Sequence, residues 1–194
     1  GIAVNTVGEV YCVGKFETTA GFGTSTLTSA GNSDIFISKL TSAGAFVWAK
    51  QIGGINGDFG NSLKVDNANN IYVGGYFTGT TDFDPNAGTT NLVSLGMEDI
   101  YILKLDASGN IQWQNTIGGS DSDYLYSIAQ TTDGGYILGG SSESNISGDK
   151  TENSNGAIDY WLVKTDSIGN IEWQNTIGGN GYDYLTSVDQ LTDG

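Results

Sequence analysis

The feature that most constrains this chain is a hairpin-like unit that occurs three times. Its copies are DIYILKLDASGNIQWQNTIGG at Asp99–Gly119, DYWLVKTDSIGNIEWQNTIGG at Asp159–Gly179 and, in looser form, DIFISKLTSAGAFVWAKQIGG at Asp34–Gly54. Self-similarity at a nearly fixed spacing is typical of repeat architectures, in which one small unit recurs and stacks on its neighbours. The chain is therefore expected to be built from repeated elements around a shared core.

Each unit predicts a β-hairpin. In the second copy, DIYILKL and IQWQNTI are short runs rich in β-branched and aromatic residues, which is the composition of strands. Between them lie Gly109 and Asn110, residues that tolerate the left-handed conformation of a tight turn. Both alternating sets of side chains in Ile100–Leu105 are largely apolar. We therefore expect this strand to be covered on both faces, as in stacked sheets.

Another pair of predicted strands precedes each hairpin, at Ile2–Phe16, Ser62–Phe77 and Tyr124–Ser141. Each repeat thus predicts four strands, here called a, b, c and d in chain order. The pattern restarts at Tyr184–Gln190 with a lone strand a. A repeated four-stranded meander with two apolar faces favours a β-propeller. A β-sandwich does not need near-identical repeats, and a β-solenoid would need shorter ones.

We therefore predict an all-β fold, a β-propeller segment of about three four-stranded antiparallel blades plus one strand of a fourth. Known propellers use roughly four to eight blades. We expect this segment to be part of a larger propeller, completed by remaining blades of the same chain or by further copies. The predicted units are 1–54 for blade 1, 55–119 for blade 2, 120–179 for blade 3 and 180–194 for the first strand of a further blade.

Composition and charge exclude several classes of function. The 194 residues include 22 acidic residues, seven lysines, no arginine and no histidine, with a formal charge of −15. Nucleic acid phosphates and anionic lipids repel such a chain, so neither a nucleic acid partner nor membrane insertion is predicted. The absence of histidine removes the usual general base and the commonest zinc ligand. We predict that the chain is not an enzyme, and we assign no catalytic residue.

The excess length of the repeats predicts a functional face. The Ile-Gly-Gly ends begin at Ile52, Ile117 and Ile177, 65 and 60 residues apart, whereas a propeller blade usually takes about 40–50 residues. The excess lies in the b–c connections 17–33, 78–98 and 142–158, whose composition predicts irregular loops. In a propeller the b–c and d–a connections emerge on the same face, so we expect the binding surface there.

Acidic residues gather in these connections. An aspartate follows each Gly-Gly by four residues, and further acids lie in the loops. One interpretation is that the repeated aspartates accept backbone N–H bonds and fix turns. The other is a binding face, in which clustered carboxylates contact a partner or hold Ca²⁺. The predicted binding-face residues are Asp58, Asp121, Asp123, Asp149, Glu152 and Asp183, and the predicted calcium ligands, in the segment DFDPNAG, are Asp82, Asp84 and Asn86.

Aromatic residues raise a hypothesis of glycan binding, because rings stack on the faces of sugars. The tryptophans of strand d are expected to pack between blades, and Trp161 in strand c is expected in the core. Phe83 and Tyr182 lie in loops and are the aromatic residues expected to be free for stacking. The strand d tryptophans are Trp48, Trp113 and Trp173.

The repeats resemble a known family. NNIYVGGY at Asn69–Tyr76, followed by DIYILKLDASGNIQW at Asp99–Trp113, is similar to the bacterial SBBP-type β-propeller repeats. The third repeat, with TTDGGYILGGSS at Thr131–Ser142, resembles the version found in large secreted proteins of Bacteroidetes, which often use the type IX secretion system.

The resemblance implies a bacterial cell-surface or extracellular protein, and with the acidic loops it favours an adhesion module that binds a protein or glycan. Two alternatives stay open. The chain is a structural spacer in a larger surface assembly, or it is part of an enzyme whose catalytic groups lie outside this segment.

Overall fold

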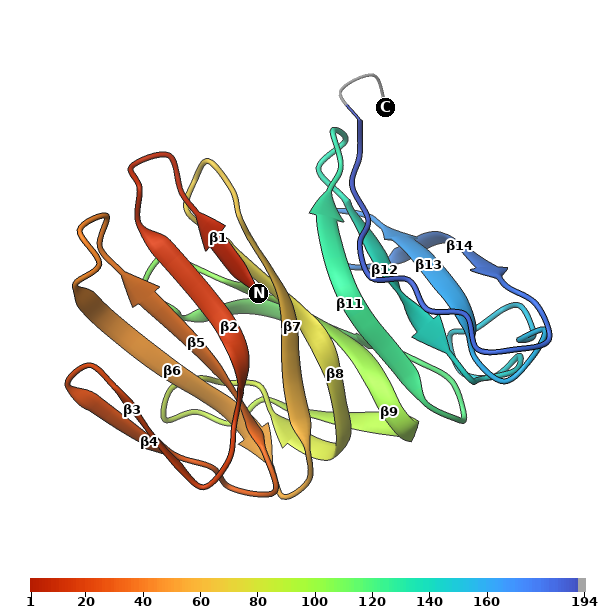
Figure 1. The fold of residues 1–194 in the computed structure, drawn as a ribbon, viewed down its shortest axis with the longest axis horizontal. Helices are drawn as coiled ribbons and strands as arrows, with labels where there is room; N and C mark the ends of the chain where they lie inside the picture. The colour runs from red at the N-terminus through yellow and green to blue at the C-terminus, as the bar shows by residue number, and fades with distance from the viewer. Residues whose placement is uncertain (192–194) are drawn as a thin grey trace.

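The computed structural model describes residues 1–191, which form strands and turns (Figure 1). No membrane-spanning helix occurs in this range. In chain order the strands are β1 (Ile2–Val4), β2 (Val10–Phe16), β3 (Thr19–Phe22), β4 (Ser25–Thr28), β5 (Asp34–Leu40), β6 (Phe46–Gly54), β7 (Asp58–Val65), β8 (Ile71–Asp82), β9 (Asn91–Leu105), β10 (Ile111–Ile117), β11 (Asp123–Gln130), β12 (Tyr136–Ser142), β13 (Asp159–Thr165) and β14 (Ile171–Ile177).

The strands form antiparallel meanders, as a propeller blade requires. The orders are β1-β2-β5-β6, β7-β8-β9-β10 and β11-β12-β13-β14. The three meanders lie side by side in Figure 1. The end of β6 also pairs with the far end of β8, through Gly53 with Asp82 and Gly54 with Thr81. This arrangement confirms the predicted fold class.

The c–d turns explain the repeated D-x-x-G-N motif. The Oδ1 atom of Asp106 accepts the backbone N–H groups of Ser108 and Asn110 at 2.8 and 2.9 Å. Gly109 has a φ of 78°, in the region that favours glycine. Asp166 makes the same hydrogen bonds in the third copy. The motif is thus a turn in which one carboxylate satisfies two backbone donors.

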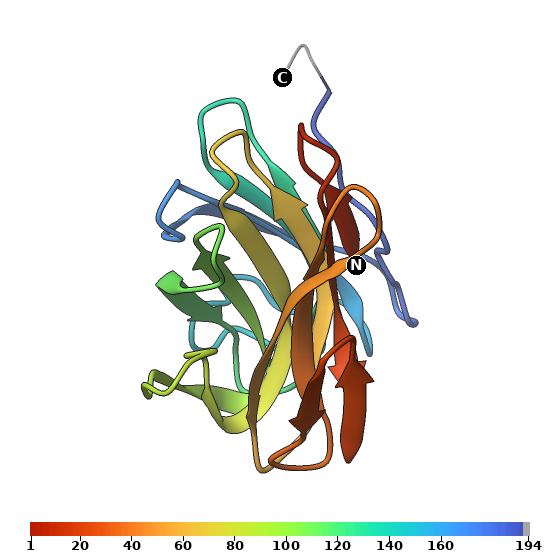
Figure 2. The ribbon, with the colours of Figure 1, turned by 90° about the vertical axis from the view of Figure 1, so that its left-hand side faces the viewer.

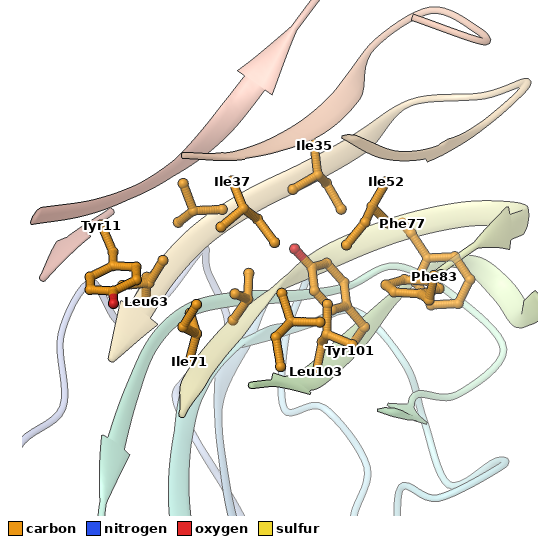
Figure 3. Packing of buried hydrophobic residues seen from close by; sticks show 13 residues of the cluster. Tyr11, Ile35, Ile37, Ile52, Leu63, Ile71, Phe77, Phe83, Tyr101 and Leu103 are labelled. Carbon is orange, nitrogen blue, oxygen red and sulfur yellow. The ribbon is translucent and has the colours of Figure 1, made fainter. Parts of the chain in front are cut away.

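Both faces of the middle blade are covered, as the pattern in strand c predicts. On β9, Tyr101 and Leu103 are 0% exposed and pack with Ile35 and Ile37 of the first blade (Figure 3). Ile100 and Ile102 point the other way and belong to a second core cluster. That cluster also contains Leu125, Ile128, Leu138, Trp161 and Val163. A strand buried on both sides therefore joins two cores, one on each side of the middle blade.

Tryptophans of strand d pack between blades where a following blade is present. The Trp48 ring lies 3.5 Å from the position that a Cβ atom on Gly109 would occupy, and Trp113 lies 3.3 Å from the same position on Gly169. Both glycines belong to the c–d turn of the next blade. Trp173 is 45% exposed and Trp161 is fully buried. The predicted roles are confirmed for Trp48, Trp113 and Trp161.

The insertions are more regular than predicted. The first contains the hairpin β3–β4, and the second lengthens β8 and β9 into a ladder from Thr80–Val93 to Asp82–Asn91. The prediction of irregular loops was wrong for these two insertions. Long connections must satisfy their backbone N–H and C=O groups, and pairing with themselves does so. The third insertion, 142–158, contains no strand after the end of β12 at Ser142, and it has isolated bridges between Ser147 and Lys150 and between Ile158 and Tyr182.

The predicted strand at Tyr184–Gln190 is not a strand in the structure. The segment still follows the path of an inner strand. Ser127 Oγ accepts the N–H of Val188 at 3.1 Å. One repeat earlier, Ser62 Oγ accepts the N–H of Ile128 in the same way. In the described range no neighbouring strand pairs with it, so no ladder forms. Residues 192–194 of the predicted unit 180–194 lie outside the described residues.

At the seams between blades, a glycine makes room for buried side chains of the next blade. A Cβ atom on Gly74 of β8 would lie 2.3 Å from Ile128 Cδ1 and 2.5 Å from Leu125 Cδ2, both on β11. Gly139 of β12 stands in the same relation to Val188 and Leu185. The missing side chain thus lets the inner strand of one blade contact the second strand of the blade before it.

Replacing Gly74 with alanine should therefore destabilise the protein. The added methyl group would overlap two buried side chains, and overpacking of this kind costs about 1–3 kcal/mol. The urea midpoint of unfolding measures the effect. Gly21→Ala is the matched control, because no atom lies within 4 Å of its Cβ position. An unchanged midpoint for Gly74→Ala would contradict this account of the seam.

Candidate functional site

The three insertions lie at one end of the blades. In Figure 1 the β3–β4 hairpin, the β8–β9 hairpin and the loop 142–158 all lie at the lower end, together with the d–a connections. Figure 2 shows the end of the β8–β9 hairpin standing out from the body of the molecule. We call this end the insertion face.

Each d–a connection turns around an aspartate. Asp58, Asp123 and Asp183 accept the N–H of the second glycine of the preceding Gly-Gly at 2.7, 2.7 and 2.8 Å. The donors are Gly54, Gly119 and Gly179. These hydrogen bonds agree with the interpretation of the repeated aspartates as turn-fixing residues.

A second aspartate, at the start of strand c, completes each corner. Asp34, Asp99 and Asp159 accept the N–H of the residue four positions earlier. They also press against the first glycine of Gly-Gly. Cβ atoms there would lie 2.2, 2.3 and 1.9 Å from the aspartate side chains, in the pairs Gly53–Asp34, Gly118–Asp99 and Gly178–Asp159.

A third repeated glycine was missed by the sequence reasoning. It stands three residues before the second corner aspartate, and a Cβ atom on it would overlap the backbone of the corner. The motif G-x-x-D, repeated in all three copies, was the signal that would have found it. The three positions are Gly31, Gly96 and Gly156.

Most corner aspartates are buried. Asp34, Asp58, Asp99, Asp123 and Asp159 are all 0% exposed. The Oδ1 atoms of Asp34, Asp99, Asp123 and Asp159 have no protein hydrogen-bond partner. Of the predicted binding-face residues, Asp58 and Asp123 are thus in the interior.

Burial changes the acidity of these groups. It raises the pKa of Asp58 to about 6, and the neighbouring charge of Asp34 adds to the shift. It raises the pKa of Asp99 to about 6, with a further contribution from Asp123. Burial also raises the pKa of Asp123. Hydrogen bonds from serines and the positive charge of the nearby Lys150 lower this pKa, but burial has the larger effect.

The third insertion is held by its own charged residues. Lys150 is 1% exposed, donates to Thr176 Oγ1 and lies 5.2 Å from the centre of the Trp161 ring. Asp149 accepts the N–H of Gly118 at 3.2 Å, and Glu152 accepts the N–H of Thr176. Asp149 and Glu152 are half-buried. Asp121 is the predicted binding-face residue that stays exposed next to these two.

A polar cleft of about 520 Å³ lies between the first two insertions. Its floor is the strand β6, and its walls come from β4 and from the segment after β8. Lys50 Nζ donates to Asn86 Oδ1 across it at 2.6 Å. The residues that line it are Leu27, Ala49, Lys50, Gln51, Gly53, Asp82, Asp84, Pro85, Asn86 and Ala87.

The cleft contains all three predicted calcium ligands, and the Oδ1 atom of each has another partner. Asp82 Oδ1 accepts the N–H groups of Asp84 and Thr90. Asp84 Oδ1 accepts the N–H of Asn86. The Oδ1 atom of Asn86 in turn accepts a hydrogen bond from the ammonium group of Lys50. Within residues 1–191 no three Asp, Glu, His or Cys side chains are grouped to hold a metal ion. Calcium binding stays a prediction.

Lys50 is a cleft residue that the sequence reasoning missed. The equivalent position in the other two copies, two residues after the strand d tryptophan, is Asn115 and Asn175. The lysine in place of asparagine was the sequence signal that could have pointed to this residue. The cleft presents an ammonium, amide groups and two carboxylates, so its chemistry suits a polar ligand that both donates and accepts hydrogen bonds.

Phe83 is not a free aromatic residue. It is 0% exposed, and its ring packs against Phe77 and Tyr101 with centroids 5.2 and 4.9 Å apart (Figure 3). The prediction that it is available for stacking was wrong, because the extension of β8 carries this side chain back into the core. Tyr182 is 70% exposed.

Stability should fall as the pH rises from about 5 to about 7. Asp58 and Asp99 have pKa values of about 6 in the folded chain, against 3.8 ordinarily. The folded state therefore holds more protons in this window, and its advantage is lost on deprotonation. The expected loss in the free energy of unfolding is on the order of 1–3 kcal/mol. Urea unfolding at both pH values measures it.

The variant Asp58→Asn should reduce this pH dependence and keep the fold. An amide retains an oxygen for the N–H of Gly54, and its NH₂ group can donate to Thr81 Oγ1, which now donates to Asp58 at 2.7 Å. The aspartates whose pKa is lowered, such as Asp106 and Asp166, lose their contribution only below pH about 4. Equal stability of the wild type at the two pH values would contradict the prediction.

Comparison with known proteins identifies the repeat. The family model described as the SBBP beta-propeller repeat matches residues 47–84. The uncharacterized WD repeat-containing protein L264 of Acanthamoeba polyphaga mimivirus is 29% identical over 116 residues, 53% of this chain and 8% of the relative. Regulatory protein FlaEY of Caulobacter vibrioides is 29% identical over 140 residues, 72% of this chain and 15% of the relative. The chain thus spans a small part of either relative, and the family match supports an SBBP beta-propeller repeat at residues 47–84.

Proposed function

We propose that this chain is a non-catalytic interaction module that uses the insertion face of its blades to bind a partner protein. The polar cleft between the first two insertions carries the proposal. Its volume of about 520 Å³ lies within the range of ligand sites, which is about 300–1,000 Å³. Its walls come from insertions that the blade itself does not need, and its floor from β6 of the blade.

A protein partner is favoured over a glycan. The cleft has no aromatic residue in its lining, and Phe83 behind it is buried. Sugar binding commonly uses an exposed ring as a stacking platform. A peptide instead offers charged and amide groups, which match Lys50, Asp82 and Asp84. The relatives named for WD repeats and regulation agree with an interaction role.

The place of action in this proposal is the bacterial cell surface or the extracellular medium, in an adhesion process. The resemblance of the third repeat to repeats of secreted Bacteroidetes proteins supports it, with type IX secretion as the proposed export route. The alternatives are a structural spacer and a part of a larger enzyme.

The double variant Asp82→Asn, Asp84→Asn tests the cleft. Asparagine keeps an oxygen for the N–H groups of Asp84, Asn86 and Thr90, so the loop should stay folded while two charges are lost. The labelled chain is applied to an array of immobilised peptides and oligosaccharides. We expect peptide binding by the wild type and a loss of about tenfold or more in the variant.

The matched control is Asp106→Asn, Asp166→Asn, which removes the same charge at the c–d turns, away from the insertion face. It should bind as the wild type does. Equal losses of affinity in both variants would show that the effect comes from net charge and not from the cleft. Binding to oligosaccharides alone would contradict a protein partner and favour a glycan. Absence of binding to any probe would favour the spacer.

A further inference from the structure

One strand of the second insertion turns its apolar side chains outward. In β9, residues 91–98 alternate between exposed and half-buried positions. The exposed positions include Val93, Leu95 and Met97, at 57, 63 and 61%. A strand with one wet face normally shows the opposite pattern, with polar residues outside. Three large apolar side chains in a row therefore form an exposed stripe.

The inner face of the same strand is filled, so the stripe is not a slip of register. Leu92 packs on the core shared by the first two blades. Ser94 Oγ accepts the N–H of Gly79 at 2.8 Å. Gly96 contacts the corner so closely that its Cβ would lie 2.6 Å from the carbonyl carbon of Ser120. A shift by one residue would break all three contacts, so Val93, Leu95 and Met97 must point outward.

The stripe borders the third insertion. Leu95 Cδ1 lies 2.9 Å from the position that a Cβ atom on Gly148 would occupy. Ile146, two residues earlier in the same loop, is 63% exposed. Val93, Leu95 and Met97 form one surface on β9, which we call the apolar stripe. It shares no residue with the polar cleft.

The stripe lies in acidic surroundings without an exposed cation in either insertion. Residues 78–98 contain no lysine, and Lys150, the sole lysine of 142–158, is 1% exposed. Glu98 follows Met97 directly, and Asp121 lies in the corner that Gly96 contacts. The acids of the two insertions are Asp82, Asp84, Glu98, Glu143, Asp149 and Glu152. A partner that covers the stripe must bring positive charge, because like charges would repel it.

The stripe follows an extended strand, and its binding groups are side chains. The ladder between β8 and β9 is interrupted by a bulge between Val93 and Glu98, where the N–H of Leu95 already donates to Asp99 Oδ2. We propose that the apolar stripe is a docking surface for an extended basic segment, in which apolar side chains alternate with lysine or arginine. The stripe residues alternate along one strand, so a segment with the same alternation packs its apolar face on the stripe and places its charges against the acidic rim.

The test uses two synthetic peptides of the same composition. One alternates valine and lysine, and the other carries the valines and lysines in separate blocks. Binding to the wild-type chain is measured by fluorescence anisotropy at low and high salt. The alternating peptide should bind more tightly than the block peptide, because it alone places all apolar groups on one side. Its affinity should weaken as salt rises, since salt screens exposed charges.

The variant Leu95→Ser, Met97→Ser removes the centre of the stripe at exposed positions, and its melting curve checks that it folds. Its affinity for the alternating peptide should fall by about tenfold or more. The matched control is Ile168→Ser, which is 62% exposed in a c–d turn. The control should bind as the wild type does.

Three results would overturn the proposal. The block peptide binds as tightly as the alternating one, the stripe variant binds as tightly as the wild type, or the control loses as much affinity as the stripe variant. Sedimentation adds a further outcome. A wild type that self-associates, with a monomeric stripe variant, would assign the surface to a second copy of this chain and exclude the basic segment. Each result leaves the function of the polar cleft untouched.

Discussion

The blades depend on one hydrogen bond, from the second glycine of Gly-Gly to an aspartate four residues later. The chain must pass from the outer strand of one blade to the inner strand of the next through a buried corner. A backbone N–H in such a place costs free energy unless it is paired. The carboxylates of Asp58 and Asp123 pair it at 2.7 Å. Burial of these two carboxylates disfavours their charged forms and raises the pKa of both groups.

The parts of the fold that repeat were predictable from the sequence. Strand β9 shows why, because its two apolar sets anticipate the two cores that Tyr101 and Ile100 enter. The parts that depend on distant contacts were not. Phe83 stands in a polar segment, and only the extension of β8 carries it inward. Tyr184–Gln190 has the composition of a strand, but a strand also needs a neighbour to pair with.

The candidate site follows a similar division. Residues common to all copies, such as the corner aspartates, proved to hold turns, and the sequence allowed that interpretation beside a binding role. Residues that depart from the repeat form the cleft and the stripe. Lys50 replaces the asparagine of the other copies, and Leu95 lies in an insertion without an equivalent. A single sequence gives few grounds to pair such residues, because they meet only after the blades are packed.

The cleft has walls from two different blades, so a ligand in it affects how firmly the blades hold together. Its floor belongs to β6 of the first blade, while Asp82 and Asp84 belong to the second, and the ladder that joins the blades at this point has only two residue pairs. Pulling the blades apart would open the cleft. A ligand that contacts both walls therefore opposes that separation, and its binding free energy adds to the cohesion of the seam. Ligand binding in the cleft and the free energy needed to separate the two blades are thus thermodynamically coupled.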